Sequence, residues 1–185
     1  MDSPAKKTYG YRERDEAQRQ VFLEQFRAYQ PADVVYVDEA GVDDTEDYPS
    51  GWNARGERFE ALKLGHRTQR ISMIAGWCQG QVLAPMTFEG MCNTDLVEAW
   101  VERFLRLELK PGQVVVMDNA SFHKSRTIRE LIEQAGCHLV FLPPYSPDLN
   151  KIEKFWARLK NYLRQNLHDF SNFWDAVDHA FKALS

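Results

Sequence analysis

Three acidic residues in this 185-residue chain stand where the local sequence pattern changes. Asp38 ends the apolar run 34–38, and Asp118 ends a second apolar run, 114–118. Glu153 follows after an interval of 34 residues, where a Pro-rich turn leads into a helical pattern. Two strand ends and one helix start that meet at one edge of a sheet would gather three carboxylates, which suits the binding of divalent metal ions.

Such a group of carboxylates would need a cation. Three negative charges at one edge repel one another by several kcal/mol in total at an effective dielectric of about 20. Ligands that are all oxygen select hard ions such as Mg²⁺, which share their coordination with phosphate. Two such ions roughly 4 Å apart support phosphoryl transfer, in which one activates the attacking oxygen and the other stabilises the leaving oxygen. The pattern therefore predicts metal-dependent chemistry on phosphate esters.

Each acidic residue also has a purely structural interpretation. Asp is common where strands end because its side chain caps turns, and this applies to both Asp38 and Asp118. Asn150 and Glu153 match the spacing of a capping box, in which Glu153 would bond back to the start of its helix. Taken singly, each residue is explained by capping, and only the three together favour a metal site.

Composition limits the class of protein. Hydrophobic residues make up 44% of the chain and aromatic residues 12%, which indicates a single domain with a real core. The formal charge of −4 excludes a strongly basic surface, so any contact with DNA must come from local patches. The three cysteines lack metal-ligand spacing, which favours a reduced, cytoplasmic protein. No apolar run approaches the ~20 residues of a membrane span, so we expect no membrane contact.

The elements that would position the carboxylates follow from periodicity and turn residues. An amphipathic helix is expected over 14–29, a buried strand over 34–38 and a long loop over 39–59. The segments 70–78 and 81–88 are typical of a β-hairpin, with Gln79-Gly80 as its turn.

The second half alternates helices and strands. Asn93 can cap a helix that runs to about Leu105, and the strand that ends at Asp118 follows. A helix over 125–135, a strand over 138–142 with His138 in the core, and helices after Pro147 and from about 170 complete the chain. This order predicts an α/β fold with a mixed sheet covered by helices.

Four blocks of this sequence are similar to a known family. They are Asp38-Glu39-Ala40-Gly41, then Trp52 with Gly56, then Asp118-Asn119-Ala120 with His123-Lys124, and finally Leu142-Pro143-Pro144-Tyr145-Ser146-Pro147-Asp148-Leu149-Asn150-Lys151-Ile152-Glu153 with Trp156. On these blocks, and on the interval of 34 residues before Glu153, the chain resembles the catalytic domain of a DDE transposase of the mariner superfamily, in its bacterial insertion-sequence branch. The resemblance covers roughly residues 33–170.

The resemblance implies a ribonuclease-H-like fold, with a mixed five-stranded sheet flanked by helices. It assigns catalysis and the binding of two Mg²⁺ (or Mn²⁺) ions to Asp38, Asp118 and Glu153. It also implies cleavage of DNA at transposon ends, transfer of the cut strand to target DNA at TA dinucleotides, and a homodimer on DNA. We further expect that the crowded carboxylates destabilise the metal-free protein, so that Asp118→Asn would stabilise it.

Contacts with the DNA backbone would come from basic residues near the carboxylates. The candidates are Arg55 in the long loop, Lys124 after Asp118, and Lys154 and Arg158 on the helix of Glu153. His123 could also contact a phosphate, although an exposed pair of loop residues, His123 and Lys124, is an equally good interpretation.

Two departures from the family leave alternatives open. The family usually has Pro where this chain has Lys151, a change that costs little in a first helical turn. The segment 1–33 is too short for the helix-turn-helix region of full-length relatives. We therefore interpret 1–33 as a helix and linker remnant and 34–185 as the catalytic domain. Recognition of the transposon ends would then be supplied by another domain or by a partner frame. A nuclease that only hydrolyses, or a non-catalytic DNA-binding or oligomerisation module, remain the alternatives.

Overall fold

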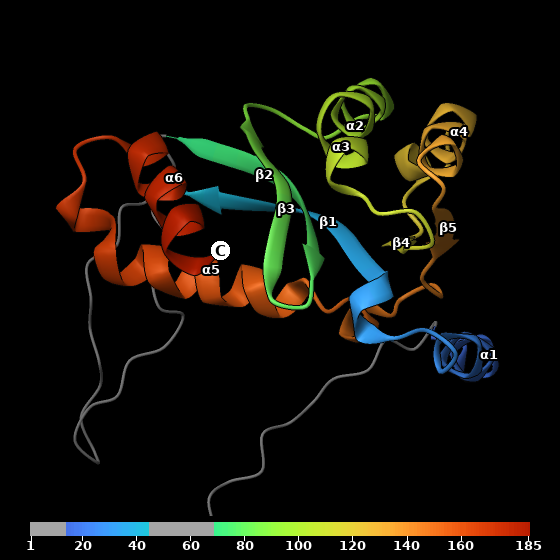
Figure 1. Cartoon of the computed structure of the whole chain (residues 1–185). Coiled ribbons are helices and arrows are strands. Elements are labelled where there is room, and N and C mark those ends of the chain that lie inside the picture. The colour runs from blue at the N-terminus through green and yellow to red at the C-terminus, as the bar shows by residue number, and fades with distance from the viewer. Residues whose placement is uncertain (1–13, 45–68) are drawn as a thin grey trace, which may run out of the picture.

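The computed structural model describes residues 14–44 and 69–185 (Figure 1). The strands are β1 (Val34–Asp43), β2 (Arg70–Cys78), β3 (Gln81–Phe88), β4 (Val114–Met117) and β5 (His138–Phe141). The α-helices are α1 (Glu16–Phe26), α2 (Thr94–Trp100), α3 (Arg106–Glu108), α4 (Arg126–Gln134), α5 (Glu153–Asn166) and α6 (Phe173–Leu184). A π-helical turn, Val101–Leu105, joins α2 to α3, and short 3₁₀ turns occupy Pro31–Asp33, Ser121–His123, Pro147–Leu149 and Leu167–Asp169.

The five strands form one mixed sheet in the order β3-β2-β1-β4-β5. The first three strands are antiparallel neighbours, whereas β1, β4 and β5 run parallel to one another. The hairpin between β2 and β3 turns at Gln79-Gly80, where both residues have positive φ, of 48° and 93°. Such turns match the twist of the flanking strands. The expected sheet and its hairpin are therefore confirmed.

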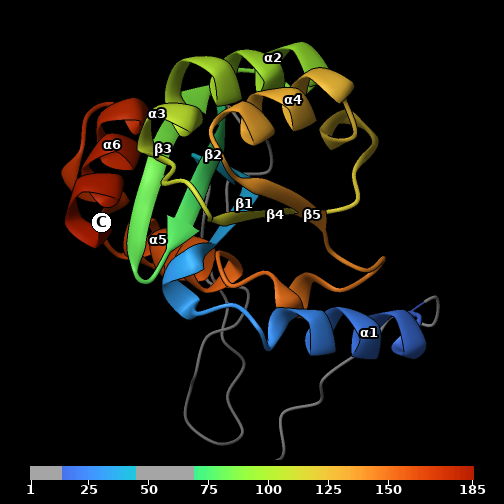
Figure 2. The same cartoon turned by 45° about the vertical axis from the view of Figure 1, so that its right-hand side comes forward.

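Helices cover both faces of the sheet, and each face has its own apolar core. Even-numbered side chains of β1 and β4, among them Tyr36 and Val116, pack against α5 and α6. Odd-numbered side chains, among them Val35 and Val115, pack against α2, its π-helical continuation and α4. Figure 2 shows α2 and α4 on one side of the sheet and α5 on the other. Because side chains alternate along a strand, the residue number decides which helices a side chain meets.

Asp38 does not end its strand, so that expectation was wrong. β1 continues to Asp43, and Asp38 itself pairs with Ala75 of β2. The pairing of β1 with β4 stops earlier, at Tyr36 and Val116. Asp38 therefore lies where β1 passes the end of β4 and loses that neighbour, so one edge of the strand is open beside it. Residues 39–43 extend the strand into the segment expected to be loop.

The expected N-terminal helix is confirmed as α1. Asp15 caps it by accepting hydrogen bonds from the backbone N–H groups of Ala17 and Gln18. Its side chains Arg19 and Phe22 are buried. Arg19 donates two hydrogen bonds, of 3.0 and 2.8 Å, to the carboxylate of Asp148 in the turn before α5. The helix is thereby attached to the turn that leads to Glu153.

Two smaller expectations have different outcomes. His138 begins β5 but is exposed, so its assignment to the core was wrong. The helix expected over 125–135 is confirmed as α4, with Ser125 as its N-cap and Gly136 following it at φ 74°. Across the described ranges, every helix is too short or too polar to span a lipid bilayer.

Candidate active site

Asp38, Asp118 and Glu153 line one cavity of about 560 Å³. The remaining lining comes from the loop after β4 and from the Pro-rich segment before α5: Asn119, Ala120, Lys124, Leu142, Pro143, Pro144, Tyr145, Ser146, Pro147 and Asn150. Tyr145 has a positive φ of 52° and is 53% exposed. For a non-glycine residue this conformation is strained, which is common in loops that border functional sites.

The sheet register brings the two aspartates to the same level. Val34, Val35 and Tyr36 pair with Val114, Val115 and Val116, a constant offset of 80 residues. The same offset would set Asp38 opposite Asp118, just past the last paired residues. Both positions belong to the even-numbered series that faces α5, and Glu153 is the first residue of that helix. One strand, the residue that follows its neighbouring strand, and a helix start thus bring the three carboxylates to one cavity.

Asp38 is the most perturbed of the three. The indole N–H of Trp156 donates to its Oδ2 at 3.2 Å. Burial raises the pKa of Asp38 from 3.8 to about 8, and the nearby carboxylates of Glu153, Glu39 and Asp118 add to the shift. An aspartate that keeps its proton near neutral pH lies in a site whose negative charges a bound cation would balance.

Asp118 is stabilised in its charged form. Its Oδ1 accepts hydrogen bonds from the backbone N–H of Ala120 at 2.9 Å and from Nδ1 of His123 at 2.7 Å. Burial would raise the pKa of Asp118, but these two hydrogen bonds, together with the nearby His123 and Lys124, outweigh burial and lower it. Asp118 thus does cap the turn after its strand, as the structural interpretation proposed, while its side chain remains 47% exposed. The repulsion expected at Asp118 falls on Asp38 instead.

His123 is a buried part of the site that the sequence did not identify as such. Its side chain is 0% exposed, so the exposed loop pair was wrong for this residue. Nδ1 contacts Asp118, and Nε2 contacts Oε1 of Glu39 at 2.6 Å. Burial opposes protonation, but the two carboxylates raise the pKa of His123 to about 9. The signal that could have found it was its place in the same sequence block as Asp118, five residues later.

Glu153 is not held by a capping box. Ile152 occupies the N-cap position of α5, and no side chain caps this end. Asn150 instead donates from Nδ2 to the backbone oxygen of Val37, at 3.4 Å, which ties the helix start to the strand beside Asp38. The capping interpretation of Glu153 was therefore wrong, and its exposed carboxylate borders the cavity.

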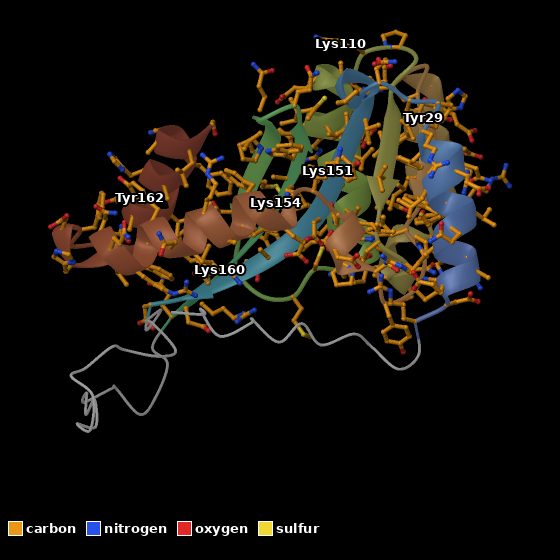
Figure 3. All side chains as sticks on the ribbon, turned by 90° about the horizontal axis from the view of Figure 1, so that it is seen from below. Tyr29, Lys110, Lys151, Lys154, Lys160 and Tyr162 are labelled. Carbon is orange, nitrogen blue, oxygen red and sulfur yellow. The ribbon has the colours of Figure 1, made fainter. Side chains whose placement is uncertain are left out.

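The predicted basic residues lie in different places. Lys124 lines the cavity itself. Lys154 borders an adjacent groove between α1 and α5, and Arg158 is exposed one turn further along α5. Figure 3 shows Lys154 and Lys160 on this helix and Lys151 in the turn just before it. Arg55 lies outside the described residues.

The donor atoms of the cavity fit a hard divalent cation. Three carboxylates line it, and Oδ1 of the buried Asn150 has no hydrogen-bond partner among the described residues. Carboxylate and amide oxygens are the ligands that Mg²⁺ and Mn²⁺ prefer. Within the described ranges, no three His, Cys, Asp or Glu side chains stand close enough to form a ready-made coordination group. An ion would therefore have to draw these side chains together.

Comparisons with known proteins agree with the geometry. A family profile described as "DDE superfamily endonuclease" matches residues 33–173. The insertion element IS630 uncharacterized 39 kDa protein of Shigella sonnei is 22% identical over 147 residues, which are 78% of this chain and 42% of that protein.

Solved structures show the same fold at low identity. The Mos1 transposase paired-end complex with the left transposon end has a TM-score of 0.72 at 14% identity, over 99% of this chain and 59% of that one. The catalytic domain of Mos1 mariner transposase has a TM-score of 0.57 at 14% identity, over 91% and 78%. The chain spans less than two thirds of the length of the IS630 protein and of the Mos1 chain in the paired-end complex. The ribonuclease-H-like sheet is confirmed, and the chain belongs to the DDE superfamily of endonucleases, with the fold of a DDE transposase catalytic domain.

Proposed function

We propose that this chain cuts DNA strands at transposon ends and transfers the freed 3′ ends to target DNA, in a reaction that depends on divalent metal ions. The observation that carries the proposal is the cavity shared by Asp38, Asp118 and Glu153, in which the pKa of Asp38 rises to about 8. A site that raises the pKa of an aspartate this far is suited to bind cations.

The solved relatives support this choice among phosphoryl transfers. They include Mos1 paired-end complexes with Mn or Mg, and a Mos1 strand transfer complex. For the present chain we propose two Mg²⁺ or Mn²⁺ ions, held by the three carboxylates. When bound, such ions activate the attacking oxygen and stabilise the leaving oxygen of an in-line displacement.

The protein's own groups then have distinct tasks. Asp38 and Asp118 supply carboxylate oxygens from two neighbouring strands, and Glu153 supplies one from the first turn of α5. Trp156 orients Asp38 by donating to Oδ2. Lys124, on the cavity wall, supplies a positive charge for a DNA phosphate.

Further contacts with DNA would follow the exposed side of α5. Lys154 and Arg158 would bind phosphates without reading bases, as would Arg55. We also propose that residues 34–185 form the catalytic domain, that 1–33 link it to a recognition domain or partner, and that the active form is a bacterial, cytoplasmic homodimer on DNA.

The test uses the full chain and two substrates. With Mn²⁺, the protein should nick supercoiled plasmid, and a duplex with a free 3′-hydroxyl should become joined to plasmid target. Glu153→Gln should abolish both products, whereas Glu102→Gln, a matched change at an exposed helical position outside the cavity, should leave both. Nicking without joining would reduce the function to hydrolysis. Nicking that survives in Glu153→Gln would contradict the proposed site.

A further inference from the structure

A buried histidine stands between two carboxylates beside the proposed metal site. The ring of His123 is 0% exposed, and each of its nitrogens faces a carboxylate oxygen, of Asp118 at 2.7 Å and of Glu39 at 2.6 Å. The ring of Phe122 also packs in an edge contact against the ring of His123, with the two ring centroids 4.6 Å apart. Both contacts are within hydrogen-bond distance, and the positioning argument needs only the Nδ1–H group to donate to the Asp118 carboxylate.

The two oxygens of Asp118 are used unequally. Oδ1 accepts from both His123 and the backbone N–H of Ala120, whereas Oδ2 accepts no hydrogen bond from any described residue. Two donors on one oxygen fix the rotation of the carboxylate. Because the side chain is still 47% exposed on the cavity side of the loop, the second oxygen is left for a ligand in the cavity.

Glu39 holds the other end of the ring. It follows Asp38 on β1, so its side chain starts on the opposite face of the sheet. The bond from Nε2 of His123 to Glu39 therefore ties the loop after β4 to the strand that carries Asp38. The chain of contacts Glu39, His123, Asp118 sets the position of one proposed metal ligand relative to the strand of another.

We propose that His123 is a positioning residue for the metal site: by donating from Nδ1 to Oδ1 it leaves Oδ2 of Asp118 as the oxygen offered to a divalent cation, and Glu39 locks the ring in that orientation. This inference rests on the proposed function. Partners that orient metal ligands in this way typically change metal affinity by about 10–100-fold when they are replaced.

Two substitutions separate positioning from simple core packing. In His123→Asn, the side-chain amide nitrogen lies near the position of Nδ1 and can still donate to Asp118. In His123→Gln, it lies near the position of Nε2 and can donate only toward Glu39. Both variants remove the ring, so a merely structural role predicts similar losses of melting temperature and no difference in metal affinity. His179→Asn and His179→Gln, at an exposed position of α6 outside the cavity, are the matched controls.

The readout is Mn²⁺ affinity without DNA, measured from the electron paramagnetic resonance signal of free Mn²⁺. We expect His123→Gln to bind Mn²⁺ about 10–100-fold more weakly than the wild type. His123→Asn should stay within about threefold of the wild type, since it keeps the donor to Asp118. Equal affinities for the two variants would overturn the inference and leave the proposed function standing. A wild-type protein that does not bind Mn²⁺ would overturn both.

A second measurement needs no variant and so does not depend on folding. Long-range ¹H–¹⁵N spectra of the wild-type protein should show His123 with a proton on Nδ1. Addition of Mg²⁺ should shift the Nδ1–H resonance, because Asp118 is polarised by the cation, and should leave the resonances of His179 in place. An Nδ1–H resonance that does not respond to Mg²⁺, in a protein that binds Mn²⁺, would refute the positioning role.

Discussion

The substitutions Asp38→Asn and Asp118→Asn should change the stability of the metal-free protein in opposite directions. Asp38 has its pKa raised to about 8 by burial and by the neighbouring carboxylates, so the folded protein holds a proton there at pH 7. Asn resembles the protonated acid and can still accept the N–H of Trp156. Asp118 is instead charged and hydrogen-bonded to His123, and Asn at that position loses the charge. Asp38→Asn should therefore stabilise the fold and Asp118→Asn should destabilise it.

The pKa of Asp38 sets an upper limit for the gain. In the unfolded chain the pKa of Asp38 is near 3.8, roughly three pH units below pH 7. Protonating this carboxylate at pH 7 costs about 1.4 kcal/mol for each of those units. This gives a ceiling of about 4 kcal/mol, and movement of the surrounding side chains reduces what is measured to about 1–3 kcal/mol. Loss of the charge on Asp118 should cost about 1–2 kcal/mol.

The sign of the pH dependence follows from the raised pKa. Between pH 4 and pH 8 the folded state holds more protons at Asp38 than the unfolded state, so wild-type stability falls as the pH rises through this window. The advantage of Asp38→Asn should therefore be near zero at pH 4 and largest near pH 8.

The assay is urea unfolding after treatment with EDTA, repeated with millimolar Mg²⁺. Bound cations should stabilise the wild type by mass action, and both variants should lose most of that gain. An Asp38→Asn protein that is less stable than the wild type at pH 8, or whose advantage is the same at pH 4, would refute the assignment of the repulsion to Asp38.

Three further outcomes are expected. Arg19→Met should destabilise the fold by about 1–3 kcal/mol in urea unfolding, because it removes two hydrogen bonds to the Asp148 carboxylate. A double-mutant cycle with Asp148→Asn should show coupling between the two residues, and additive effects would contradict this. Asn150→Ala removes the hydrogen bond from the helix start to the backbone oxygen of Val37, beside Asp38. It should therefore lower the nicking rate by about tenfold or more and leave binding to duplex DNA unchanged in a gel-shift assay. Unchanged nicking would count against that role. The isolated chain should bind any duplex weakly, and Arg158→Ala should flatten the salt dependence of binding by about one unit, whereas a slope equal to that of the wild type would exclude a phosphate contact.

Local sequence was sufficient for most of the elements and for singling out the three acidic residues that line one cavity. The β-branched runs before Asp38 and Asp118, the turn at Gln79-Gly80 and the apolar spacing of the helices are short-range signals, and the sheet formed from them as expected. Parallel strands bring their ends to one edge, so the approach of the two aspartates also followed from the order of the elements.

Only the tertiary structure decided the state of each carboxylate. Whether Asp38 ends its strand depends on how far β2 stays paired with β1, and no pattern within residues 34–43 encodes that. The bond between His123 and Glu39 joins residues 84 positions apart, and the donation from Asn150 to Val37 spans 113. Their partners are chosen by strand register and by the packing of α5 on the sheet. Burial, and with it the sign of each pKa shift, is a property of that packing, because the same Asp side chain is destabilised as an anion at position 38 and stabilised as an anion at position 118.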